Sequence, residues 1–172
     1  MDAKNIIDWF NLQPNTQEGG FFAGTYTSKL TIDNKELPGF KPVKPNRPIC
    51  GGIYYFLDPT TFSAMHKVTG DMLYHFYSGA PVQMLLLYPE GYPNRSEVCI
   101  FSNDLAAGGN PMKMIPGGTW LGSRLVAGGE YALMGVTMSP GFDPADYSIA
   151  KRKELIRQYP DQAALITTLT RS

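Results

Sequence analysis

The two histidines of the chain lie on either side of a short turn. His66 precedes the turn and His75 follows it, within the stretch FSAMHKVTGDMLYHFYSG at 62–79. A histidine with an unperturbed pKa of about 6.5 can take or give a proton at neutral pH. Tyr74 stands beside His75, and a tyrosine hydroxyl can return a proton on the opposite face of a substrate. These residue types predict acid–base chemistry, with His66 as the base and Tyr74 as the acid.

The neighbouring residues indicate what kind of pocket would surround the reacting groups. Successive side chains of a β-strand point to opposite faces, so Tyr74 and Phe76 point inward if Met72 does. The alternate residues then point outward: Leu73, His75 and Tyr77. By the same alternation, Leu121 and Ser123 point inward from a later strand. The sequence therefore predicts an aromatic and apolar pocket with few polar groups, which is the usual make-up of a small-molecule site.

Glu18 is the acidic residue that we assign to the same pocket. It precedes Gly19 at the start of a predicted strand, from which its carboxylate could reach the mouth of the fold. The alternative is a turn or interface carboxylate that accepts hydrogen bonds from backbone amides. The pocket itself also has an alternative, because small barrels are often filled by their own side chains. In that case Met72, Phe76 and Leu121 form a closed core.

The elements that position these residues are predicted to be short strands. Among 172 residues there are 18 Gly and 14 Pro, and brief runs rich in Tyr, Phe, Val, Ile and Leu lie between them. This texture is typical of an all-β sandwich or barrel, and the length favours a single domain over 1–172. The predicted strands span 20–28, 51–57, 62–67, 72–77, 82–88, 97–101, 112–115, 119–126 and 130–138.

Short helices are predicted at both ends of the chain. An N-terminal helix over 3–12, ended by Pro14, is predicted by four apolar residues at roughly helical spacing: Ile6, Ile7, Trp9 and Phe10. After Pro140, charged and apolar residues alternate at helical spacing and predict one or two terminal helices. The segment 30–48 carries four prolines, which predict an irregular excursion over the surface or across the mouth.

Charge and hydropathy argue against several kinds of partner. The 15 basic and 15 acidic residues cancel without forming a basic stripe, so no nucleic-acid partner is expected. No apolar stretch is long enough to span a membrane, and 1–10 does not resemble a secretory signal, so we expect a soluble cytoplasmic protein. Cys50 and Cys99 lack the C-x-x-C spacing of a metal or redox motif, and we assign them no function.

The stretch around His66 resembles the first motif of the cupin superfamily, in which two histidines, a glutamate and a glycine line a β-barrel. His66 matches the second histidine and Gly79 the glycine. The resemblance is stronger to the small single-domain cupins of largely unknown function, which are similar to dTDP-sugar 3,5-epimerases. Five segments carry it: EGGFF (18–22), IYYFL (53–57), MHKVTGDMLYHFYSG (65–79), IPGGTW (115–120) and SPGFDPADY (139–147). It implies a double-stranded β-helix, or jelly-roll, barrel and supports a homodimer.

The metal ligands of the superfamily are largely missing from this chain. Ala64 stands where the motif has its first histidine, Met72 where it has the acid, and Leu121 where the second motif has a histidine. A divalent transition metal needs about three or four convergent nitrogen and oxygen donors. Asp71 precedes Met72 and should point the opposite way, so His66 would stand alone. The sequence therefore predicts no metal and no other cofactor.

Three functions are compatible with these residues. The first is a metal-independent isomerase or epimerase that acts next to a carbonyl, on a sugar or a related polar metabolite, with His66 as base. The residues that could supply a cation for an enolate have no predicted place: Arg47, Lys67 and Arg124. The alternative is a metabolite-binding cupin without turnover. The third is a metal-dependent cupin enzyme with a degraded ligand set, and whether the protein is an enzyme stays open.

Overall fold

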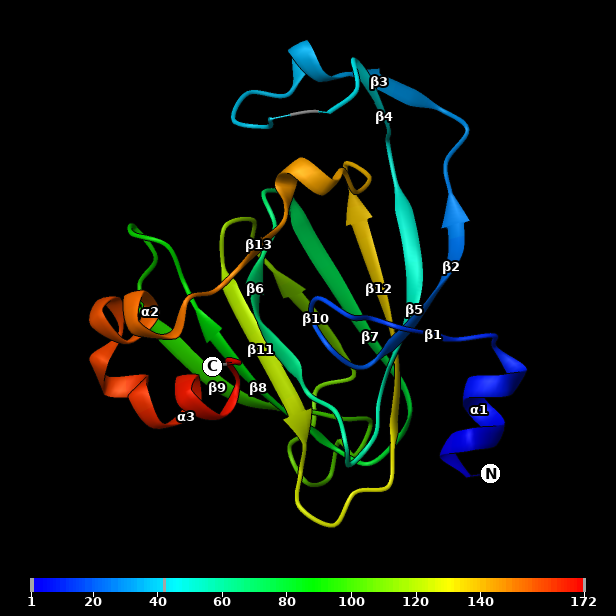
Figure 1. Cartoon of the computed structure of the whole chain (residues 1–172), viewed down its shortest axis with the longest axis vertical. Helices are drawn as coiled ribbons and strands as arrows, with labels where there is room; N and C mark the ends of the chain where they lie inside the picture. The colour runs from blue at the N-terminus through cyan, green and yellow to red at the C-terminus, as the bar shows by residue number, and fades with distance from the viewer. Residues whose placement is uncertain (1, 42, 172) are drawn as a thin grey trace.

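Two antiparallel β-sheets face each other and enclose the main core (Figure 1). The computed structural model describes residues 2–41 and 43–171, and within that part of the chain one sheet has six strands and the other five. The six-stranded sheet contains, in spatial order, β1 (Gln13–Pro14), β2 (Phe21–Thr27), β5 (Gly51–Leu57), β12 (Ala132–Ser139), β7 (Asp71–Gly79) and β10 (Met112–Ile115). The five-stranded sheet contains β13 (Ser148–Ile149), β6 (Ser63–Lys67), β11 (Trp120–Leu125), β8 (Val82–Leu87) and β9 (Ser96–Phe101). The prediction of an all-β jelly-roll barrel is confirmed.

Strand β7 shows how the sequence pattern produces the barrel. Its even-numbered residues from Met72 to Phe76 are buried between the sheets, while the odd-numbered residues from Asp71 to Tyr77 are half-buried or exposed. The strand pairs with β12 on one side and β10 on the other. Because one face is apolar and the other is not, a slip of one residue would expose the whole buried row. The alternation therefore fixes which side chains face the barrel interior.

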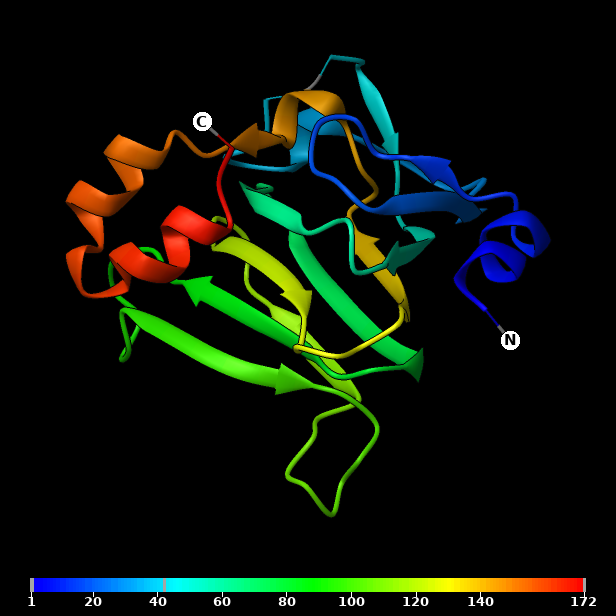
Figure 2. The same cartoon turned by 60° about the horizontal axis from the view of Figure 1, so that its bottom comes forward.

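Helices cover the outer faces of both sheets (Figure 2). Helix α1 (Ala3–Trp9) packs Ile6 against Phe56 and Leu133 of the six-stranded sheet. It ends earlier than the predicted residue 12, because Asn11 adopts a left-handed conformation with φ of 50°. Helices α2 (Arg152–Gln158) and α3 (Ala163–Thr168), joined by the 3-10 turn η3 (Pro160–Gln162), form a second core with β6 and β8. No helix in these described ranges is long and apolar enough to cross a membrane.

The proline-rich segment 30–48 is more regular than predicted. It forms the short paired strands β3 (Thr31–Asp33) and β4 (Asn46–Pro48), with the 3-10 turn η1 (Asn34–Glu36) between them. In Figure 1 these elements project from one end of the barrel, above the segment that follows β12. Arg47 is the buried residue of β4, and its guanidinium binds Asp146 in the 3-10 turn η2 (Pro144–Asp146). A buried charge with a paired partner therefore fixes a segment whose composition alone indicates a loop.

Candidate functional site

A cavity of about 640 Å³ lies at the end of the barrel near this projecting segment. Strands β2, β5, β6, β7 and β12 contribute its walls, together with the loop before β2 and the segment after β12. The polar side chains that line it include Asn15, Glu18, Tyr55, His66, Tyr74 and Tyr147. The structure thus brings together four residues that the sequence assigned to the site: Glu18, His66, Met72 and Tyr74.

His66 is buried in β6, with 2% of its surface exposed. Its Nδ1 lies 2.8 Å from the carbonyl oxygen of Ala64, two residues earlier in the same strand. A carbonyl oxygen can only accept a hydrogen bond, so Nδ1 carries a proton, and Nε2 of the neutral ring keeps its lone pair. Within 2–41 and 43–171 no hydrogen bond to Nε2 is found. The arrangement leaves His66 able to accept a proton through Nε2.

Glu18 approaches the same ring from the loop before β2. Its Oε1 lies 3.8 Å from His66 Nδ1 and accepts a hydrogen bond of 2.6 Å from Ser63 Oγ. The second oxygen, Oε2, accepts a longer hydrogen bond of 3.4 Å from the Asn15 amide. The carboxylate therefore accepts hydrogen bonds from side chains. The alternative prediction, in which it accepts hydrogen bonds from backbone amides, does not describe this arrangement. Because it lies close to Nδ1, it would stabilise an imidazolium formed on His66.

Two glycines shape the loop that positions Glu18. Gly19 has φ of 106° and Gly20 has φ of 68°, a region that side-chain-bearing residues rarely adopt. A Cβ built on Gly19 would lie 2.1 Å from the Phe62 carbonyl oxygen. The loop therefore passes too close to the chain before β6 for any side chain to fit there. The Glu-Gly-Gly sequence at 18–20 fixes where the carboxylate enters the cavity.

Three tyrosines surround the carboxylate, and their pKa values share a cause. Burial, followed by the charge of Glu18, raises the pKa of the Tyr55, Tyr74 and Tyr147 hydroxyls above the usual value. All three therefore stay protonated as hydrogen-bond donors over the physiological pH range. Tyr55 already donates to the Gly19 carbonyl at 2.8 Å, which further fixes the loop. Tyr74 and Tyr147 are the hydroxyls available to a ligand.

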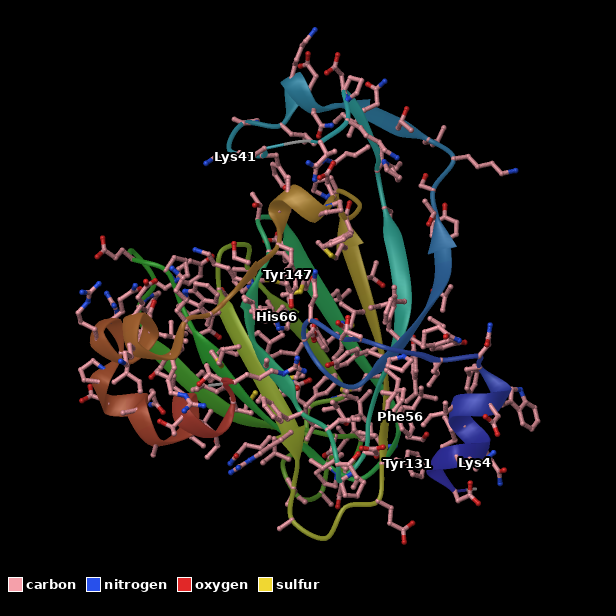
Figure 3. All side chains as sticks on the ribbon, in the orientation of Figure 1. Lys4, Lys41, Phe56, His66, Tyr131 and Tyr147 are labelled. Carbon is pink, nitrogen blue, oxygen red and sulfur yellow. The ribbon has the colours of Figure 1, made fainter. Side chains whose placement is uncertain are left out.

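Tyr147 is the site residue that sequence reasoning missed. Its ring stacks on the His66 imidazole, with centroids 5.5 Å apart and planes at 18°, and Figure 3 shows the two side chains adjacent inside the barrel. Its hydroxyl oxygen is buried, and no partner for it exists among the described residues. Buried polar groups are rarely left unpaired, so this hydroxyl points to a ligand or water partner. The available signal was the segment 139–147, which carried the cupin resemblance but was not assigned to the site.

The segment that carries Tyr147 is fixed by a buried polar cluster. Asp143 caps η2, because its side chain accepts a hydrogen bond of 2.9 Å from the Ala145 amide. Asp146 pairs with Arg47. The Arg47 guanidinium also binds the Asn34 side-chain oxygen. These contacts hold Tyr147 over His66, and they place Arg47 outside the cavity wall, where it cannot stabilise an enolate.

The other candidate cations also lie away from the cavity. The ammonium group of Lys67 lies 4.7 Å from the centre of the Trp120 ring. The Arg124 guanidinium donates to Gln83 Oε1 at 3.3 Å. No lysine or arginine side chain occurs among the described residues that line the cavity.

The structure places three predicted pocket residues elsewhere in the barrel. Phe76 packs edge-on against Phe101, with centroids 5.6 Å apart, in the main core. Leu121 and Ser123 are buried in β11 and are not among the residues that line the cavity. Alternation predicted that these side chains face inward, but it does not say how far along the barrel the cavity extends. His75 faces outward and stacks on Tyr77.

The residues at the cupin metal positions do not fit a metal ion. Ala64 and Leu121 offer no donor, and Met72 offers only a soft thioether. His66 directs its Nδ1 to a backbone carbonyl, and its nearest carboxylate is Glu18. Among the residues that the structure describes, no group of three or more His, Cys, Asp or Glu side chains is placed to hold a metal. The polar groups that remain at the cavity, among them His66 and Glu18, can bind a ligand by hydrogen bonds or transfer a proton.

Comparison with known proteins identifies the family. The model of the family Cupin_5, described as cupin superfamily (DUF985), matches residues 4–150. A hypothetical protein from Leishmania major shares 23% identity and a TM-score of 0.87 over 100% of both chains. A protein from Shewanella oneidensis shares 27% identity and a TM-score of 0.82, covering 99% of this chain and 98% of its own. No protein of curated function matches the chain.

A more distant structure shows the same barrel. A cupin 2 domain-containing protein from Halorhodospira halophila has a TM-score of 0.57 at 9% identity, covering 90% of this chain and 84% of its own. Such a likeness shows the fold alone. The barrel with its cavity supports a small-molecule-binding cupin. The family match spans most of the chain, and the protein therefore belongs to the Cupin_5 family of the cupin superfamily.

Proposed function

We propose that this cupin is a metal-independent isomerase or epimerase, which moves a proton at a carbon next to a carbonyl group. One observation carries the proposal: His66 lines the cavity with Nδ1 bound to the Ala64 carbonyl, so Nε2 is the free basic nitrogen. A base of this kind needs a defined tautomer and a fixed orientation. The structure of β6 supports both.

The proposed reaction uses the two faces of the cavity. Nε2 of His66 takes the proton from the carbon next to the carbonyl, which leaves an enolate on the substrate and an imidazolium on the protein. Tyr74 then donates its hydroxyl proton to the same carbon from the opposite face, which inverts it. Water carries the proton from the imidazolium back to the Tyr74 phenolate. The charge of Glu18, 3.8 Å from Nδ1, stabilises the imidazolium that forms in the first step. Burial and the same charge destabilise the Tyr74 phenolate, which favours its reprotonation in the last step.

Hydrogen exchange tests the proposal without knowledge of the substrate. A panel of chiral carbonyl compounds, including sugars and related polar metabolites, is incubated with the protein in deuterium oxide. Nuclear magnetic resonance then shows which compound gains deuterium next to its carbonyl. We expect exchange with the wild-type protein and none with His66→Asn, while the affinity for the same compound stays within about tenfold.

The matched control is His75→Asn. His75 lies on the outer face of β7, so this variant should exchange as the wild type does. Tyr74→Phe should slow inversion and leave some exchange, because the base is still present. If no compound exchanges although one binds tightly to both wild type and His66→Asn, the proposed reaction is wrong.

The second candidate function is ligand binding without turnover. It is favoured by the loss of donors at Ala64, Met72 and Leu121, together with a wall that is mainly apolar. In that case His66 and Tyr147 hold a ligand by hydrogen bonds and by shape. A metabolite that co-purifies with the protein or raises its melting temperature, but never exchanges a proton, would support this function.

A further inference from the structure

Glu18 is a buried carboxylate without a lysine or arginine partner among the described residues. It is buried, with 8% of its surface exposed, and its carboxylate receives hydrogen bonds from Ser63 and Asn15. In the part of the chain that the structure describes, no lysine or arginine lies within ion-pair distance, and the one ionisable partner is His66. A buried carboxylate is normally paired with a cation, because removing a lone charge from water is costly. A buried carboxylate without a lysine or arginine partner among the described residues is therefore unusual.

The wall around this carboxylate is rich in aromatic rings. Six of the residues that line the cavity are aromatic: Phe22, Tyr26, Tyr55, Tyr74, Phe142 and Tyr147. The face of an aromatic ring carries partial negative charge and attracts a cation within about 6 Å of its centre. A cavity of about 640 Å³ is large enough for a small organic molecule. The aromatic rings and the carboxylate therefore both attract cations.

Two lysines near this end of the barrel lie behind the cavity wall. Lys41 and Lys67 line a separate hollow of about 340 Å³, on the side of Ala145 and Asp146. Figure 3 shows Lys41 at the end of the molecule, away from His66 and Tyr147. Arg171 is exposed and donates to the carbonyl of Thr16, a residue of the cavity lining, at 2.8 Å. Burial raises the pKa of Tyr147, while the charge of Arg171 lowers it, so this guanidinium lies near the cavity without lining it. Among the described residues, no lysine or arginine side chain contributes to the wall of the aromatic cavity.

We propose that the ligand of this cavity carries a compact organic cation, an ammonium group, bound between the Glu18 carboxylate and the aromatic wall. The proposal deepens the proposed function, on which it rests for the choice of cavity. A positive charge near the reacting carbon would also make its proton more acidic, which suits a histidine base. The same electrostatics disfavour phosphorylated and nucleotide-linked sugars, whose negative charge would meet Glu18 without a cation to bind them.

A matched pair of probes isolates the effect of charge. Choline and 3,3-dimethylbutan-1-ol have nearly the same shape, but only choline is charged. Binding of both is measured by isothermal titration calorimetry with the full chain. We expect the wild-type protein to bind choline at least about tenfold more tightly than the neutral probe. In Glu18→Gln this preference should fall below about threefold, while binding of the neutral probe stays unchanged.

Two further variants separate binding from loss of the fold. Phe142 is half exposed at the rim, so Phe142→Leu should fold and should weaken choline binding more than binding of the neutral probe. Glu97 lies outside the cavity, paired with Lys113, so Glu97→Gln should keep the full preference for choline. Equal binding of the two probes by the wild type would overturn the proposal, as would absence of choline binding at millimolar concentration or an unchanged preference in Glu18→Gln.

The same variants distinguish this proposal from the proposed function. His66→Asn should keep the preference for choline and lose proton exchange. A wild-type protein that prefers choline but exchanges no proton contradicts the isomerase alone. A protein that exchanges protons but binds both probes equally contradicts the cation site alone.

Discussion

Arg47 and Asp146, 99 residues apart in the sequence, form a buried ion pair that joins the projecting segment 30–48 to the segment that carries Tyr147. Only 1% of each side chain is exposed. The pair is further bound by Asn34 and lies under the Phe40 ring. One side of the cavity therefore depends on a polar contact outside it.

Replacement of one partner of the Arg47–Asp146 pair should destabilise the fold far more than replacement of both partners. Arg47→Met leaves Asp146 buried and unpaired, so we expect a loss of about 3–5 kcal/mol in the free energy of unfolding. The double variant Arg47→Met with Asp146→Leu should lose less than the single variant. Urea denaturation followed by tryptophan fluorescence measures both. A loss below about 1 kcal/mol for Arg47→Met would show that the pair does not stabilise the fold.

Three alanine substitutions should separate backbone strain from steric overlap. Gly19 has positive φ and no room for a Cβ, Gly128 has positive φ of 83° with open space, and Gly24 has open space without positive φ. We expect Gly24→Ala to change stability little and Gly128→Ala to cost about 1–2 kcal/mol. Gly19→Ala should cost at least about 3 kcal/mol. Thermal unfolding measures the series, and a Gly19→Ala variant as stable as Gly128→Ala would contradict the close approach to Phe62.

The buried tyrosines should make the protein unstable in alkali. Burial and the charge of Glu18 raise the pKa of Tyr55 and Tyr74 well above the usual value. The folded state therefore keeps these protons to higher pH than the unfolded state does, and the stability is lost as the pH rises beyond about 10. Phenolate absorbance should show these tyrosines ionising only as the protein unfolds. Ionisation of all tyrosines near pH 10 in the folded protein would be the contrary result.

The outer face of β7 and β10 should form the interface of a homodimer, as we propose from its exposed apolar side chains. Tyr77 is 49% exposed, and Met112 and Met114 of the edge strand β10 are each 55% exposed. An exposed edge strand with apolar neighbours favours pairing with another chain. Light scattering at micromolar concentration should give the mass of a dimer, and Met114→Lys should shift it toward the monomer. A wild-type monomer at that concentration would refute the interface.

Much of the barrel could be predicted because strands leave a local signal. The alternation of Met72, Leu73 and Tyr74 gives the face of each residue, and glycines and prolines mark the turns. Each of the nine predicted strands corresponds to a strand of the barrel, with shifts of up to two residues at the ends. The paired strands of 30–48 left no such signal, because Arg47 and its partner Asp146 are joined only in the folded chain.

The site was predicted less completely than the fold. His66, Tyr74 and Glu18 line the cavity, and they could be assigned to it because their types suggest chemistry and their places match cupin segments. Tyr147 was missed, since stacking of its ring on His66 depends on how the chain after β12 returns over the barrel. Side-chain direction alone assigned three further residues to the pocket: Phe76, Leu121 and Ser123. Direction does not say how far along the barrel a side chain lies. Side-chain type and face are local properties, whereas cavity shape is a property of the assembled fold.

The hydrogen bond from His66 to the Ala64 carbonyl has an evolutionary consequence. The orientation of the imidazole is specified within three consecutive residues of β6, through main chain that any residue at position 64 would supply. Rim residues such as Phe142 or Tyr26 can therefore vary, and the cavity can adapt to new ligands, without disturbing the basic nitrogen. A barrel of this kind can diversify in specificity while it inherits one unchanged orientation of the imidazole.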